Sequence, residues 1–360
     1  MSDRRNRGEV STEGAKDMIL HTELTVSRKN GVTLIELLVV IGLVGLLAMM
    51  ILPAIQSSRE SARRSQCVNH LKQIGLGVAN FESVNQKLPS LCMSDDRAQY
   101  VDGYDALLSI HYRILPYIEE RPLFDSINIH AAAIKKISSD DCFENRTVRN
   151  TRVDKFLCPS DQQVGYPGNN YRGNLGPYPH RFSHAETPGA GGPFEFMRDA
   201  PSTRITDGLS TTVGFSERLQ GGGDDSRFDR SRDFWYAGFQ PAHEATATPE
   251  QFLEYCGLAP ARPLHTNMRF GKFWLPGIRP YTVYDHVFPP NPKIPDCSSD
   301  VLFLNPDSFN HAAVSARSNH PGGVHAGFMD GSVRFVKNSV SLSVWRAAAT
   351  RAGKDDAEGL

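Results

Sequence analysis

The sequence carries almost no excess of charge of either sign. Its 360 residues include 39 Lys and Arg against 40 Asp and Glu, a formal net charge of -1. Proteins that bind nucleic acids by general electrostatic attraction usually carry a basic face or tail. The balance therefore argues against nucleic acid as a partner.

Long hydrophobic runs are scarce, and only one is long enough to cross a membrane. Residues 32–55 read VTLIELLVVIGLVGLLAMMILPAI, in which Glu36 is the only charged residue. A helix of this length extends about 36 Å, whereas the hydrocarbon layer is about 30 Å thick. A core helix of a soluble domain normally keeps a polar stripe, which this run lacks. The sequence predicts a single membrane-spanning segment.

The usual signatures of catalysis and of zinc binding are missing. There is no His-Glu-x-x-His, no P-loop and no Cys-x-x-Cys, and residues 214–218 (GFSER) lack the second glycine of a nucleophile elbow. Adjacent acids at 95–96, 140–141 and 224–225 are more typical of solvated loops than of a glycosidase pair. We therefore expect no enzymatic activity, no cofactor and no bound metal. A tethered hydrolase is the less favoured alternative.

The residues before the apolar run form a distinctive signal. A polar leader ends in Arg28-Lys29-Asn30-Gly31, and the run starts at once with Val32-Thr33-Leu34-Ile35-Glu36. This arrangement resembles the class III signal of type IV pilins and type II secretion pseudopilins. The resemblance implies cleavage by a prepilin peptidase between Gly31 and Val32, methylation of the new amino terminus, and roles for Glu36 and Pro53 in assembly. Val32 stands where Phe is usual, and Met18 is an alternative start to Met1.

Glu36 is an acid in an otherwise apolar helix. A central carboxylate in a membrane helix costs about 2.5–3.5 kcal/mol, so such residues normally find a partner. In an assembled filament, the resemblance implies that Glu36 faces the amino group of Val32 on a neighbouring subunit. In an isolated subunit, Glu36 could instead reach water at the membrane edge. Both interpretations stay open from the sequence.

Apolar residues continue beyond the run at helical spacing. Val68, Leu71, Ile74, Val78 and Phe81 recur at intervals of three and four, which predicts an amphipathic helix lying on a core. The basic Arg28-Lys29 pair favours a cytoplasmic leader, although Arg59, Arg63 and Arg64 beyond the run weaken this charge argument. The resemblance to the prepilin signal implies the same orientation, with the rest of the chain beyond the membrane. We expect a bacterial cytoplasmic-membrane protein with one span and a periplasmic or cell-surface domain. The predicted segments are a leader (1–31), a membrane half-helix (32–55), its amphipathic continuation (56–85), an extracytoplasmic α+β domain (86–350) and a polar tail (351–360).

The remaining chain predicts short strands and helices separated by turn residues. Strands are expected at 211–215, 233–238, 281–287, 324–329 and 332–336, and helices at 104–119 and 341–350. Asp330-Gly331 lies between two β-prone runs and predicts a hairpin with a type I′ turn.

A histidine, His320, precedes Asp330-Gly331 by the spacing His-x9-Asp-Gly. This module resembles the carboxy end of the prepilin-like family called domain of unknown function 1559. We favour a structural role for His320, as a strand-start residue bonded to a neighbouring loop. The alternative is a metal or ligand contact shared with His325 or Asp330, which form a weak ligand set.

The resemblance to that family extends through most of the chain. The segments that carry it are 65–74 (SQCVNHLKQI), 156–161 (FLCPSD), 169–171 (NNY) and 205–212 (ITDGLSTT), the last preceding a strand that ends in Glu217. The family implies a pilin-like α+β domain, with a long helix packed on a mainly antiparallel sheet with long loop insertions, and it implies no reaction.

Six cysteines are an even number in a domain that we place outside the membrane, where disulfides persist. Their spacing does not fix the pairing. We favour Cys67 with Cys158, because both lie in segments that resemble the family.

These observations predict a structural or assembly role in a filament, pseudopilus or surface layer. Self-association or contact with other pilin-like subunits is expected. The alternative is a tethered module that binds glycan, Ca²⁺ or protein, to which Asp224 and Asp225 could contribute oxygen ligands.

Overall fold

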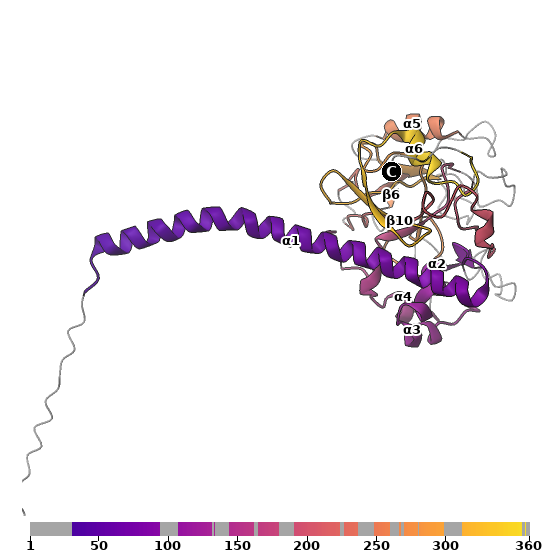
Figure 1. Ribbon diagram of the computed structural model, residues 1–360, viewed down its shortest axis with the longest axis horizontal. Coiled ribbons are helices and arrows are strands. Elements are labelled where there is room, and N and C mark those ends of the chain that lie inside the picture. Colours follow the sequence, from indigo (N-terminus) through magenta and orange to yellow (C-terminus); the bar gives the residue numbers. More distant parts are fainter. Residues whose placement is uncertain are drawn as a thin grey trace, which may run out of the picture. The chain divides into compact units, whose positions relative to one another are not determined.

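The computed structural model in Figure 1 divides into two compact units, residues 1–55 and 56–360. The division falls where the sequence analysis ends the apolar segment. The leader through Asn30 lies outside the described residues. The structure describes residues 31–93, 107–131, 133, 144–161, 165–179, 191–223, 227–236, 248–259, 266–267, 270–279, 281–298, 312–354 and 357.

The first unit contains the beginning of helix α1 (Leu34–Asn85), which continues through Pro53. The helix starts with a capping box. Thr33 Oγ1 accepts a hydrogen bond from the Glu36 amide (3.3 Å), and Glu36 Oε2 accepts one from the Thr33 amide (2.9 Å). The large apolar side chains of residues 32–55 are all exposed. Among the described residues, α1 is the one helix long and apolar enough to cross a membrane.

In the second unit, α1 packs on the domain core through a regular stripe. Cys67, Leu71, Ile74, Val78 and Phe81 are buried, and they repeat at intervals of four and three. The stripe begins one residue earlier than predicted, because Val68 is only half-buried. The amphipathic helix is confirmed.

Most strand pairings are antiparallel, as expected. A five-stranded sheet has the order β11-β10-β4-β3-β7, and a four-stranded sheet has the order β6-β5-β8-β9. Only the β3–β7 and β5–β8 pairings are parallel among the described strands. The strands are β1 (Cys92–Met93), β2 (Leu108–Ser109), β3 (Tyr171–Asn174), β4 (Val213–Glu217), β5 (Phe234–Tyr236), β6 (Thr266–Asn267), β7 (Val283–Tyr284), β8 (Asp296–Ser298), β9 (Ala312–Ala313), β10 (Gly323–Phe328) and β11 (Val333–Lys337).

The helices of the second unit after α1 are short. The helix predicted at 104–119 is replaced by β2, α2 and a 3₁₀ turn, in which Pro116 supplies no amide donor. The one predicted at 341–350 is α6, capped by Ser341 and ending at Ala347. The bounds are α2 (Ile110–Ile114), η1 (Leu115–Tyr117), α3 (Arg121–Asp125), α4 (Arg146–Arg149), η2 (Asp154–Phe156), η3 (Ser202–Arg204), α5 (Pro249–Gly257) and α6 (Leu342–Ala347).

The predicted hairpin at Asp330-Gly331 is present as β10 and β11, but its turn is not type I′. Gly331 has a φ of 84°, whereas Asp330 is absent from the described residues with positive φ. The Gly331 amide donates to the Phe328 carbonyl (3.0 Å), and the Phe328 amide donates to the Ser332 carbonyl (2.8 Å). This is the three-residue hairpin loop, a type I turn followed by a left-handed glycine.

The packed domain continues beyond residue 350. Arg351 is buried, and its carbonyl accepts hydrogen bonds from the amides of Thr206 and Asp207. The Asp207 carboxylate in turn accepts from the amides of Gly353 and Lys354. Residues 351–354 therefore belong to the folded domain and not to a polar tail.

His286 is fully buried in its neutral form. Its ring stacks on Trp345, Nδ1 donates to the Trp345 carbonyl (2.6 Å), and Nε2 accepts from the Tyr284 hydroxyl (2.8 Å). Burial lowers the pKa of His286 to about 3, although the carbonyl partially opposes this shift. The unfolded chain therefore takes up this proton at a higher pH than the folded protein.

We predict that His286→Gln reduces the sensitivity of the protein to acid. Below pH 6.5 the wild type should lose stability more steeply than the variant, by about 1.4 kcal/mol per pH unit, until the pH approaches 3. The measurement is urea unfolding between pH 6 and 4.5 in detergent. Equal slopes for the two proteins would show that His286 does not titrate in this way.

Candidate functional site

The candidate site is centred on Glu217, the last residue of β4. Strand β4 lies between β10 and β3, and all five of its residues are buried. The Glu217 carboxylate accepts three hydrogen bonds. Oε1 accepts from His320 Nε2 (3.1 Å) and His325 Nδ1 (3.2 Å), and Oε2 accepts from the His325 amide (2.8 Å). A buried carboxylate with this many donors is well satisfied.

His320 lies between two carboxylates. Its Nδ1 contacts Glu60 Oε1 on α1 at 3.0 Å, and its Nε2 contacts Glu217 Oε1. Because both partners are acceptors, both ring nitrogens donate, and His320 is an imidazolium. Glu60 is oriented further by Ser160 Oγ (3.1 Å) and by a salt bridge from Arg63 (2.8 Å). The histidine thus connects α1 to the central strand of the sheet.

His325, on β10, uses one ring nitrogen as an acceptor and the other as a donor. Arg64 Nε donates to His325 Nε2 at 3.2 Å, and a guanidinium can only donate. His325 Nε2 is therefore the acceptor, and Nδ1 carries the proton that it donates to Glu217. The Arg64 guanidinium also lies over the Phe335 ring at 3.9 Å. Arg64 therefore makes a second connection between α1 and the sheet.

The charges in the cluster stabilise one another. Burial opposes ionisation of Glu217, but the hydrogen bonds from His320 and His325 outweigh it and lower the pKa of Glu217. Burial likewise disfavours the charged form of His320, and the contacts with Glu217 and Glu60 overcome this and raise the pKa of His320. The cluster is an alternating arrangement of acids and bases. Its centre is closed to solvent, since the side chains of His320 and Glu217 are 0% and 2% exposed, whereas Glu60 is 28% exposed.

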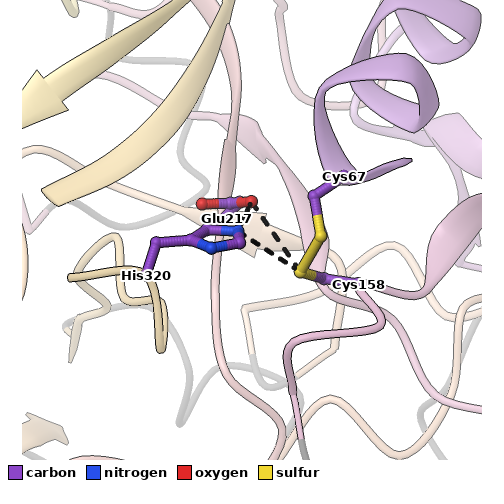
Figure 2. A group of neighbouring side chains, drawn as sticks. All are labelled: Cys67, Cys158, Glu217 and His320. Carbon is purple, nitrogen blue, oxygen red and sulfur yellow. Dashed lines mark hydrogen bonds and ion pairs between the residues drawn. A yellow bond between two sulfur atoms is a disulfide. The ribbon is translucent and has the colours of Figure 1, made fainter. Parts of the chain in front are cut away.

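A disulfide lies against the same two residues. Cys67 of α1 is joined to Cys158, with 5.1 Å between their Cα atoms, and this is the pairing that the sequence analysis favoured. Figure 2 shows the Cys158 sulfur facing Glu217 and His320, at 3.9 Å from Glu217 Oε1 and 3.7 Å from His320 Nε2. The four side chains are buried, and their donor atoms all lie within 4.8 Å of one another. These are the residues of the described chain that could hold a metal ion.

The structure gives His320 different neighbours from those expected. Its two carboxylate partners come from α1 and β4 instead of a neighbouring loop. The His325 ring lies edge-on to it, with 4.7 Å between ring centroids. Asp330 and Gly331 lie beyond the opposite end of β10, where Asp330 Oδ1 accepts a bond from the Ser332 amide. His320 and Asp330 therefore do not form one site.

The other predicted residues lie elsewhere. Gly31, Val32, Glu36 and Pro53 belong to the first unit. A second disulfide joins Cys256 of α5 to Cys297 of β8, and Cys92 is buried in β1. Cys142 and the acidic pair 224–225 lie outside the described residues.

Sequence reasoning missed Glu60 and Arg64 as parts of the site. Both lie on the stripe that buries Cys67 and Leu71, since positions 60, 64, 67 and 71 follow spacings of four and three. The same helix face continues toward the amino terminus with polar residues. Following the spacing of four and three there, without requiring apolar residues, could have found both. Glu217 was noted only as a strand end.

Two family models match the chain, one in each of its two parts. Residues 56–343 match the model described as protein of unknown function (DUF1559), which covers more than half of the sequence. The chain belongs to this family. Residues 26–52 match the prokaryotic N-terminal methylation motif, so the DUF1559 chain is a pilin-like, membrane-anchored protein. The motif implies processing by a prepilin peptidase. No curated protein and no solved structure matches the chain.

We predict that Glu217→Gln strongly destabilises this DUF1559 protein. The substitution leaves a buried imidazolium with one carboxylate partner, and breaking such a pair typically costs about 3–5 kcal/mol. Urea unfolding in detergent can be followed by the fluorescence of the buried Trp274 and Trp345. Glu254→Gln, at an exposed position of α5, is the matched control and should change stability by about 0.5 kcal/mol or less. Equal effects of the two substitutions would contradict the account of the cluster.

Proposed function

We propose that this protein is a non-enzymatic, membrane-anchored subunit, processed after Gly31, with a structural or assembly role in a filament, pseudopilus or cell-surface layer. The observation that carries the proposal is the exposed apolar half of α1. Residues 32–55 expose their large apolar side chains, directly after a prepilin-type motif. A surface this apolar needs a membrane or other subunits around it. The motif supports the membrane as one of these surroundings, and the proposal adds other subunits as the second.

The cluster at Glu217 supports a structural role for the domain. Its titratable side chains are bonded to one another and hold α1 against the sheet, and Glu217, His320 and His325 are closed to solvent. Catalytic groups need access for a substrate, and binding sites of small ligands are generally concave and open. The cluster therefore supports a structural role for the domain rather than a catalytic one.

The cysteines support an orientation with the domain outside the cytoplasm. Two disulfides join cysteines in the part of the chain that the structure describes, and disulfides persist in oxidising compartments. The Arg28-Lys29 pair before the apolar segment favours a cytoplasmic leader. This is the topology that a prepilin-type signal requires.

Glu36 is the residue through which we propose that subunits recognise one another. In the single chain its carboxylate bonds the Thr33 amide, at the first turn of α1. Cleavage after Gly31 creates a charged amino group on Val32, only four residues before Glu36. A carboxylate already held at this helix end can exchange the amide for the amino group of a neighbouring subunit. This pairing offsets the cost of burying both charges.

We predict that Glu36→Ala blocks assembly while the protein remains in the membrane. The amount of protein in the sheared surface fraction should fall roughly tenfold or more, since loss of about 1.4 kcal/mol per contact already gives a factor of ten. The measurement is an immunoblot of sheared and membrane fractions. Glu254→Ala, which removes an exposed acid of α5, is the control and should assemble like the wild type. Normal amounts of Glu36→Ala in the sheared fraction would overturn the pairing.

A further inference from the structure

The donor atoms beside the disulfide are spaced like the ligands of a zinc ion. In a tetrahedral site with the usual bond lengths, sulfur lies about 3.6 Å from nitrogen or oxygen ligands, and nitrogen lies about 3.4 Å from oxygen. Cys158 Sγ is 3.7 Å from His320 Nε2 and 3.9 Å from Glu217 Oε1. His320 Nε2 is 3.1 Å from Glu217 Oε1. The three atoms are therefore already close to the separations that one zinc ion requires of its ligands.

The fourth ligand is the Cys67 sulfur. With the disulfide open, this sulfur must move to about 3.8 Å from Cys158 Sγ, the separation expected for two thiolates on one zinc ion. The two Cα atoms are 5.1 Å apart, so rotation of the side chains supplies this movement without a shift of α1. Cys67 and Cys158 then complete a set of two thiolates, one imidazole and one carboxylate.

The surrounding residues orient these ligands as they do in metal sites. A histidine ligand usually donates its other ring N–H to a carboxylate, and ligating carboxylates are themselves hydrogen-bonded. His320 Nδ1 donates to Glu60, so Nε2, which donates to Glu217 in the disulfide form, can bind the metal once it loses its proton. Glu217 is itself held by His325, whose amide donates to Oε2 and whose Nδ1 donates to Oε1, and Oε1 lies on the side of Cys158.

We propose that Cys67, Cys158, Glu217 and His320 bind Zn²⁺ in the dithiol form of the protein, and that the disulfide and the metal ion alternate at this position. A dithiol reductant supplies two electrons and two protons, which break the sulfur–sulfur bond, and is itself oxidised to a disulfide. Zn²⁺ then displaces the two thiol protons and the proton on His320 Nε2. The site changes from a neutral Glu217–His320 pair to a zinc complex of net charge −1, and the Arg64 guanidinium lies on the neighbouring His325. Either form holds α1 to the sheet.

The test is zinc binding by the full-length protein in detergent. The protein is reduced with dithiothreitol, freed of reductant under nitrogen, incubated with Zn²⁺ and dialysed, and its metal content is measured by mass spectrometry. We expect one zinc ion per chain in the reduced protein and none in the oxidised protein. Absence of retained zinc in the reduced wild type would overturn the proposal.

Matched variants identify the ligands. Cys67→Ser keeps the other cysteines and should lose the ion, whereas the double variant Cys256→Ser and Cys297→Ser removes the second disulfide and should keep it. Glu60→Gln should weaken zinc affinity by about 10–100-fold through the orientation of His320. Retention of as much zinc by Cys67→Ser as by the wild type would show adventitious binding.

A spectroscopic measurement on the wild type does not depend on whether the variants fold. Co²⁺ replaces Zn²⁺ in tetrahedral sites and reports its ligands by absorption. The reduced wild type should show tetrahedral ligand-field bands together with charge-transfer bands from two thiolates. A spectrum of octahedral cobalt without thiolate bands would contradict the assignment.

Discussion

The buried carboxylate of Glu217 is the constraint on which the domain depends. It accepts hydrogen bonds from His320 and His325. These two histidines in turn contact Glu60 and Arg64 on α1. The next residue, Arg218, is also fully buried and pairs with Asp296 on β8 at 2.9 Å, in the four-stranded sheet. Two adjacent residues at the end of β4 thus connect the five-stranded sheet to the helix and to the second sheet. Because buried charges are costly without partners, each of these buried charged side chains requires its own partner.

The parts of the fold that follow from local pattern were predictable. The apolar segment, the amphipathic half of α1 and the hairpin at Asp330 each have a repeating spacing or a turn signal within a few residues. The site was much less predictable, because its contacts join residues far apart in the chain. Glu60 and His320 are separated by 260 positions, and no short pattern links them. The Cys67–Cys158 pairing was suggested by family resemblance, since spacing alone left the pairing open.

Secondary structure differed from expectation where tertiary contacts decide the outcome. The strand predicted at 281–287 forms ladder pairs through Val283 and Tyr284, whereas the Asp285 amide donates to the Val314 carbonyl, outside the β3 pairing. The position of His320 depends on tertiary contacts in the same way. His320 and Asp330 share a sequence module, yet they lie at opposite ends of strand β10. The carboxylate partners of His320 come from α1 and β4. A motif recognised along the chain is therefore not evidence of a common site.

The central functional claim is that the chain is processed and anchored as a prepilin-type subunit. The exposed apolar half of α1 and the closed, cross-linked domain are the physical features that this claim explains together. The most direct test is the mass of the amino-terminal peptide of the protein isolated from membranes. The account predicts a peptide that begins at Val32 and carries one methyl group. A peptide that retains the leader, or one that begins after the apolar segment, would contradict it.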